Sequence, residues 1–135
     1  MNKTAVIILL LPVILLSCNS NEKKAPQTDT ETATVFIRYV LDNKLADAES
    51  LLLDDEENQQ YFERFKQQYR KKDKAELEKY RSSDIIINEI SNVSDTITIV
   101  NYSNSYKKEI KNKIKLVRPH GQWLIDLKYT FSGNL

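Results

Sequence analysis

The sequence predicts an α+β domain in which three N-terminal helices pack on a four-stranded antiparallel meander. The first part of the chain after residue 28 carries apolar residues at helical spacing. From Asp84 onward, β-branched and alternating runs replace that pattern. Short polar turns, and no further helical segments, separate these runs. Helices followed by strands joined through turns are typical of an α+β fold.

A short apolar leader precedes this domain. Residues 1–4 carry one positive charge at Lys3, and residues 5–16 form an almost unbroken apolar run that contains Pro12. A membrane-spanning helix needs roughly 20 apolar residues. The run is shorter than that, so it fits the apolar part of a secretory signal better than a membrane span.

The leader closes with Leu15-Leu16-Ser17-Cys18, which contains the only cysteine of the chain. This stretch resembles the bacterial lipobox. The resemblance implies that residues 1–17 are a signal peptide and that Cys18 becomes the acylated first residue. We therefore expect a protein of the cell envelope, held to the outer membrane by lipid on Cys18, since several acyl chains bind a bilayer far better than one. An ordinary secretion signal and an uncleaved anchor are the alternatives.

Composition limits the classes of partner. Residues 18–28 are polar and are expected to form a flexible stalk, which leaves residues 29–135 as one domain. The chain has 20 Lys and Arg against 19 Asp and Glu, and Lys3 leaves with the leader. A balance near zero gives no long-range attraction to nucleic acid. Two glycines argue against a glycine-rich phosphate loop, and we expect neither a metal nor a cofactor.

The helical part begins with a capping signal. Thr28 followed by Glu31 matches a capping box, so a helix should start at this point. Asn43 is the expected end of that helix, because Asn tolerates the left-handed conformation. A shorter second helix is expected over about residues 45–52.

A third helix is expected over about residues 58–81. The acidic run 54–57 before it is interpreted as a loop that places negative charge at the helix N-terminus, because the spacing of a calcium loop is missing. The basic cluster 70–74 is interpreted as a solvated face. The apolar stripe of this helix is mainly aromatic and is expected to be core, with ligand contact by one or two tyrosines as the alternative: Tyr61, Phe62, Phe65, Tyr69, Leu77 and Tyr80.

The sheet is expected to consist of strands near residues 85–87, 97–100, 107–116 and 123–131. A four-residue loop at 118–121 would place Leu116 opposite Trp123, Ile114 opposite Ile125 and Lys113 opposite Asp126. Lysines alternate along the outer face of the third strand. This face is interpreted as solubilising, with a docking surface or a homodimer contact as the alternative.

Two segments carry a more specific resemblance. Residues 36–52, an aromatic-led helix, a polar break and an apolar helix containing Ala48, resemble the opening of the nuclear transport factor 2-like superfamily. Gly121-Gln122-Trp123 resembles its closing hairpin. The match is nearest to small bacterial lipoproteins related to lumazine-binding-like domains, and it implies a cone-shaped, cystatin-like roll. The superfamily includes enzymes, ligand binders and assembly modules, so the fold alone does not choose a function.

The distribution of titratable groups favours a binding function. We expect a non-enzymatic, membrane-tethered domain that binds a small molecule or a protein. The alternative is an isomerase- or hydrolase-like enzyme that uses Asp84 and a tyrosine. Asp126 and His120 are less suitable catalytic groups, because Asp126 is expected to point outward and His120 to lie in a hairpin loop. The candidates for pocket lining, with plain core packing as the alternative, are Asn112, Trp123, Tyr129 and Tyr61.

Overall fold

The computed structural model describes residues 24–131, so the leader, Cys18 and the first part of the stalk lie outside the described residues. No helix within residues 24–131 has the length and apolar character needed to cross a bilayer. The elements, in chain order, are α1 (Asp29–Leu41), α2 (Leu45–Glu49), α3 (Glu56–Tyr69), α4 (Lys74–Arg81), β1 (Ile85–Ser94), β2 (Ile97–Asn104), β3 (Asn112–Val117), β4 (Leu124–Asp126) and α5 (Leu127–Phe131).

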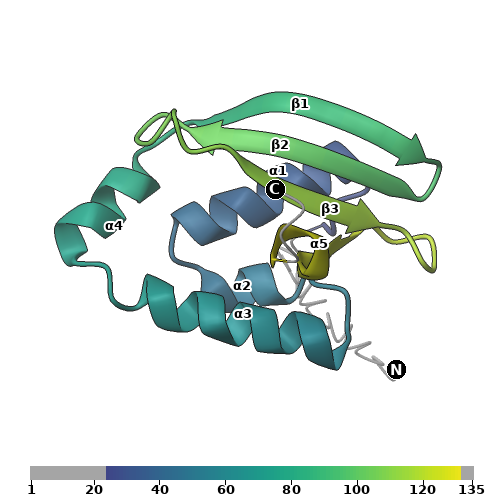
Figure 1. The fold of residues 1–135 in the computed structure, drawn as a ribbon, viewed down its shortest axis with the longest axis horizontal. Coiled ribbons are helices and arrows are strands. Elements are labelled where there is room, and N and C mark those ends of the chain that lie inside the picture. The colour runs from purple at the N-terminus through teal and green to yellow at the C-terminus, as the bar shows by residue number, and fades with distance from the viewer. Residues whose placement is uncertain (1–23, 132–135) are drawn as a thin grey trace, which may run out of the picture.

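The strands form one antiparallel sheet in the order β1-β2-β3-β4. All the helices lie on one side of this sheet, with α1 directly beneath it and α3 further away (Figure 1). The predicted α+β class and the four-stranded meander are therefore confirmed. The core lies between the two layers and is made of residues that are almost completely buried: Phe36, Ile37, Phe62, Val100, Ile114 and Leu116.

The predicted limits of the first helix are confirmed. The Thr28 hydroxyl accepts the backbone N–H of Glu31 at 3.1 Å, as a capping box requires. The Glu31 carboxylate accepts the N–H of Gln27 at 2.9 Å, one residue earlier than in the usual box. Asn43 follows the helix with a φ of 59°, the left-handed conformation that Asn adopts more readily than most residues.

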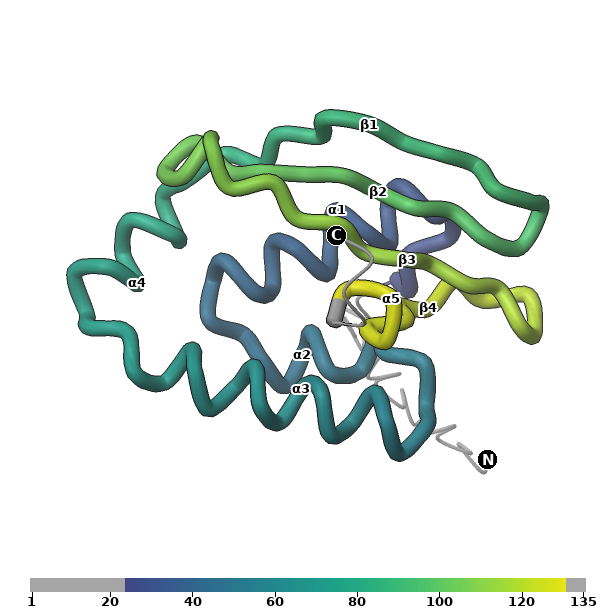
Figure 2. Tube along the Cα trace, viewed as in Figure 1, coloured from purple at the N-terminus to yellow at the C-terminus, as the bar shows by residue number. Residues whose placement is uncertain are grey.

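The single helix predicted over residues 58–81 is wrong, because α3 and α4 are separate helices. Asp73 begins α4, and its carboxylate accepts the N–H of Glu76 at 2.8 Å. Asp55 begins α3 in the same way and accepts the N–H of Asn58 at 2.8 Å. The prediction that the acidic run supplies charge at the start of α3 is confirmed, but Glu56 and Glu57 lie in the first turn of the helix and not in the predicted loop. Figure 2 shows the chain turning between the two helices.

The predicted third strand is too long at its start. Asn104 ends β2, and its side-chain oxygen accepts the N–H groups of Tyr106 and Lys107 at 3.1 and 3.0 Å. These bonds hold the chain in a turn, as Asn commonly does, so β3 begins only at Asn112. Ile110, expected on the apolar face of the strand, is 53% exposed in this connection. The connection lies at the same end of the molecule as α4 (Figure 2).

The predicted register of the last hairpin is shifted by two residues. Leu116 pairs with Ile125, and Lys115 pairs with Asp126. Trp123 stays in the loop, where the Arg118 guanidinium lies 5.8 Å from its ring centre. A shift of two preserves the face of every side chain. Asp126 therefore lies on the lysine face as expected.

Asp126 is nevertheless not solvated, as its predicted outward position would imply. Its side chain is only 8% exposed and pairs with Lys115 at 3.6 Å and with Lys128 at 3.4 Å. The lysine side chains cover the carboxylate while their charges neutralise it.

The predicted strand over residues 123–131 is wrong after Asp126. The side-chain oxygen of Asn58 accepts the N–H of Leu127 at 2.7 Å, and Asp126 accepts the N–H of Lys128 at 3.2 Å. These two side chains take the N–H groups that a longer strand would offer to its neighbour. The chain turns into α5 at this point.

Candidate functional site

A cleft lies between the helix layer and the sheet. It consists of two adjoining cavities of about 250 and 270 Å³. We call the first the α4 cavity, because its lining extends to α4 and the β2–β3 connection. We call the second the α5 cavity, because its lining extends to α5. The two are neighbouring parts of one cleft because they share five lining residues: Val40, Phe65, Gln68, Tyr102 and Asn112. Clefts that combine apolar walls with a few polar groups are the usual form of small-molecule sites.

Local sequence patterns explain how the lining forms. Alternation along β2 turns Val100, Tyr102 and Asn104 toward the helices, and alternation along β3 does the same for Asn112 and Ile114. Side chains spaced three and four residues apart lie on one helix face, so the aromatic stripe of α3 faces this sheet surface.

The α5 cavity is largely apolar. Its walls include the buried side chains of Phe36, Phe62, Ile114 and Leu127. The Thr130 hydroxyl is already used, because it donates to the backbone oxygen of Lys113 at 2.7 Å. This part of the cleft suits an apolar group.

The α4 cavity is bordered by a continuous row of aromatic rings. Phe65 and Tyr69 have ring centres 5.4 Å apart, and Tyr69 and Tyr80 have ring centres 6.1 Å apart. Tyr106 of the β2–β3 connection then meets Tyr80 edge to face at 5.2 Å. Such distances are typical of favourable ring pairs. The row joins α3, α4 and the sheet around this end of the cleft.

Tyr69 carries an unsatisfied polar group in this row. Its side chain is buried, and its hydroxyl is the one buried side-chain polar atom in the described part of the chain that has no hydrogen-bond partner. Burial raises the pKa of Tyr69 to about 12, and the neighbouring Tyr80 and Glu76 act in the same direction. Leaving a buried hydroxyl without a hydrogen-bond partner costs roughly 1–3 kcal/mol. The Tyr69 hydroxyl therefore does not stabilise the folded chain.

Positive charge gathers at the mouth of the α4 cavity. Lys72 and Lys107 both line the cavity, and both pair with one oxygen of Glu76, at 3.0 and 3.1 Å. Lys72 and then Lys107 lower the pKa of Glu76. The Tyr80 hydroxyl and then Glu76 raise the pKa of Lys107. Two lysine ammonium groups therefore share one carboxylate at this end of the cleft.

The four predicted lining residues do not lie together. Asn112 lines both cavities. Trp123 lies at the other end of the sheet, in shallow depressions shared with Asp29 and with Arg118. Tyr61 is half-buried on α3 under the Arg64 guanidinium, 4.7 Å from its ring centre. Tyr129 is half-buried on α5, and neither tyrosine lines the cleft.

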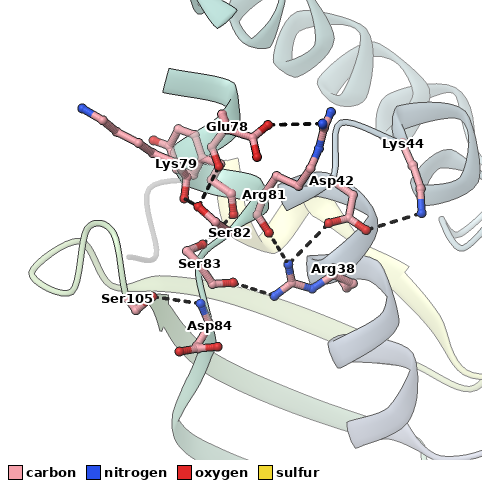
Figure 3. Close-up of polar contacts among 11 residues, drawn as sticks. Arg38, Asp42, Lys44, Glu78, Lys79, Arg81, Ser82, Ser83, Asp84 and Ser105 are labelled. Carbon is pink, nitrogen blue, oxygen red and sulfur yellow. Dashed lines mark hydrogen bonds and ion pairs between the residues drawn. The ribbon is translucent and has the colours of Figure 1, made fainter. Parts of the chain in front are cut away.

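Asp84 lies outside the cleft. It is exposed just before β1, and its backbone N–H donates to the Ser105 hydroxyl at 2.8 Å. Figure 3 shows its carboxylate directed away from the neighbouring polar cluster. His120 is exposed in the β3–β4 loop. Neither side chain lines the α4 or the α5 cavity.

The polar cluster beside Asp84 attaches α4 to α1 (Figure 3). The Arg38 guanidinium donates to the backbone oxygens of Arg81 at 3.2 Å and Ser83 at 2.8 Å. These carbonyls belong to the end of α4 and the residues after it, where intrahelical partners run out. Asp42 holds the guanidinium from the other side at 3.4 Å. The cluster thus sets the position of Tyr80 over the cleft.

Sequence reasoning did not identify Tyr102, Lys72 or Lys107 as site residues. For Tyr69 and Tyr80, the sequence offers only the alternative that one or two tyrosines of the aromatic stripe contact a ligand. A signal for Tyr102 was present, since it continues the inward alternation of Val100. No sequence signal joins Lys72 to Lys107, because only the folded chain brings them to one carboxylate.

The described residues offer no grouping of three or more histidine, cysteine or acidic side chains that could hold a metal ion. No family model matches the chain, and neither the curated proteins nor the solved structures include a significant match. The geometry of the cleft is therefore the basis for a functional proposal.

Proposed function

We propose that this protein is a bacterial cell-envelope lipoprotein, tethered through acylated Cys18, whose non-enzymatic domain binds a small molecule in the cleft between α1, α3 and the sheet. The unpaired, buried Tyr69 hydroxyl beside the cleft is the observation that carries the binding proposal. A bound molecule with a hydrogen-bond acceptor would satisfy it.

Several features support a binder. The two cavities lie side by side and offer apolar walls at one end and polar groups at the other. Asn112 adds an amide to both cavities, and no hydrogen bond of this side chain is formed within the described residues. A site with one apolar and one polar end orients an amphipathic ligand.

We also infer that the domain adopts a nuclear transport factor 2-like, cystatin-like roll. The order of helices before an antiparallel meander supports this inference, as does a cleft between one sheet face and the helices. An experimental structure that superposes on members of that superfamily with the same strand order would bear it out.

Native mass spectrometry of the protein purified from its own host tests the binding proposal. We expect a retained mass beyond those of the chain and its lipid. Gln68→Trp should abolish that mass, because Gln68 is exposed on α3 and lines both cavities. Gln67→Trp is the matched control, since Gln67 is also exposed but lines neither cavity. Identical spectra for the two variants, or no retained mass at all, would contradict the proposal.

Fractionation tests the tether. With Cys18→Ser, the protein should leave the membrane fraction and retain its unprocessed leader. Continued membrane association with normal processing would show that Cys18 does not carry the anchor.

A further inference from the structure

We propose that the ligand is a small apolar acid, whose carboxylate lies at the Tyr69–Lys72–Lys107 end of the cleft and whose apolar body fills the α5 cavity. This inference rests on the proposed function and specifies the ligand class of the same site. It follows from three features of the α4 cavity: the unused donor, the charge balance and the shape of the walls.

The unused donor is the first feature. The Tyr69 hydroxyl is buried and unpaired, and burial favours its neutral, donating form. A carboxylate oxygen is the acceptor that gains most from such a donor, because hydrogen bonds to charged groups are stronger than those between neutral groups. The hydroxyl is closed off in the structure, so a head group would reach it only after neighbouring side chains move. Such side-chain changes are common on binding.

The charge balance is the second feature. Lys72 and Lys107 share the single carboxylate of Glu76, and Lys79 adds a third ammonium, 5.5 Å from the Tyr106 ring centre. Lys72 and Lys107 also lie 5.0 and 5.2 Å from the centre of the Tyr80 ring. Neighbouring cations repel each other, and an anionic head group would remove part of that repulsion.

The walls are the third feature. Away from the residues that it shares with the α4 cavity, the α5 cavity presents apolar side chains from α1, α3, β3 and α5, and the Thr130 hydroxyl there is already bonded. A second charged end would be left there without a partner, at a high cost in free energy. A ligand with one charged end and an apolar remainder therefore fits both halves of the cleft, whereas a diacid or a sugar would place charged or polar groups against the apolar walls of the α5 cavity.

Octanoate is a suitable probe, with octanamide and octylamine as neutral and cationic counterparts of the same length. Titration calorimetry would use the full chain in nanodiscs after exhaustive dialysis, with empty nanodiscs as the blank. We expect octanoate to bind at least about tenfold more tightly than octanamide, and octylamine not to bind. Equal binding of octanoate and octanamide, tighter binding of octylamine, or no binding of octanoate would overturn the inference.

Two variants locate the head group. Tyr69→Phe removes only the hydroxyl and should weaken octanoate binding about ten- to a hundredfold, with a smaller effect on octanamide. Tyr61→Phe is the matched control on the same helix and should leave binding unchanged, because Tyr61 does not line the cleft. Lys107→Gln should weaken octanoate about three- to tenfold. Unchanged octanoate affinity in Tyr69→Phe would contradict the assigned position.

The failures of the two proposals are distinguishable. If the protein from its host carries a ligand that Gln68→Trp removes, yet octanoate does not bind, the cleft is a binding site and only the ligand class is wrong. If neither a retained ligand nor octanoate is observed, the binding function itself is wrong.

Discussion

The two ends of the cleft are held together in opposite ways. At the α5 end, Asn58 is completely buried and bonded through both side-chain polar atoms: its oxygen accepts the N–H of Leu127 at 2.7 Å, and its nitrogen donates to Asp55 at 2.9 Å. At the α4 end, Tyr69 is buried but its hydroxyl has no partner. One end is closed by bonds within the chain, while the other keeps a polar group unused.

The two short helices at these ends differ as well. α5 contributes Leu127 to the core, and Lys128 forms ion pairs with Asp55 and Asp126. α4 has no buried residue, and it is attached by the half-buried Tyr80 ring, by Arg38 and by partly exposed ion pairs. Elements with few buried contacts open more readily than the core. The α4 end is therefore the part of the cleft that we expect to open more readily.

Breaking the closed end should have the largest effect. Asn58→Ala leaves the buried N–H of Leu127 without an acceptor and removes the bond to Asp55. We expect a loss of about 2–4 kcal/mol in the free energy of unfolding, measured by urea denaturation. Gln67→Ala on the same helix is exposed and should change stability by less than about 0.5 kcal/mol. Similar values for the two variants would show that the Asn58 bonds do not hold this end.

Detaching α4 should have a smaller and more local effect. Arg38→Met keeps much of the side-chain volume but removes the donors to Arg81 and Ser83. We expect a loss of about 1 kcal/mol, because the guanidinium is partly exposed to solvent. Hydrogen exchange should accelerate in α4 and not in α5. A uniform acceleration across both helices would show that Arg38 supports the whole domain instead.

Removing the unused Tyr69 hydroxyl should raise the free energy of unfolding, whereas the two changes above lower it. Tyr69→Phe loses no hydrogen bond within the described chain, so the unliganded protein should gain about 1 kcal/mol in stability. The thermal midpoint would rise by roughly 4–8 °C for a domain near 100 residues. A loss of stability would reveal a partner for this hydroxyl and would remove the main support for the ligand proposal.

The smallest expected effect is on the stability of the protein at acidic pH. Burial alone would raise the pKa of Asp55, but hydrogen bonds from Lys128 and Asn58 outweigh it, so this pKa is lowered from its ordinary 3.8. A lowered pKa contributes stability above the unfolded value, and this contribution is lost as the pH falls through the folded value.

Asp55→Asn keeps a capping side chain at the start of α3 but removes the charge that pairs with Lys128. As the pH falls from about 5 to 2, the variant should therefore lose less stability than the wild-type protein. The difference between the two losses should be less than about 1 kcal/mol. Identical pH profiles would show that the ion pair contributes nothing to the closed end.

Much of the helical part was predictable because its signals are local. Thr28, Asn43 and Asp55 each act on backbone groups within a few residues, so the helix boundaries that they set can be read directly from the sequence. The pair Asp73 and Glu76 carries the same kind of signal for the start of α4, but the aromatic stripe continues past this pair and predicts one long helix. Of the four candidate lining residues, only Asn112 lies in the cleft, because alternation predicts a face but not a neighbour across the core.

The amino-acid sequence alone determined the α+β class, the helix starts and the inward faces of the strands, since capping and alternation depend on residues close in the chain. Tertiary structure decided where the last strand ends, because the oxygen of Asn58 takes the N–H of Leu127 from 69 positions away. Tertiary structure also decided which residues meet at the cleft. Lys72 and Glu76 are close in the chain, but Lys107 comes from the distant β2–β3 connection, so the two lysines share one carboxylate only because the fold brings these segments together.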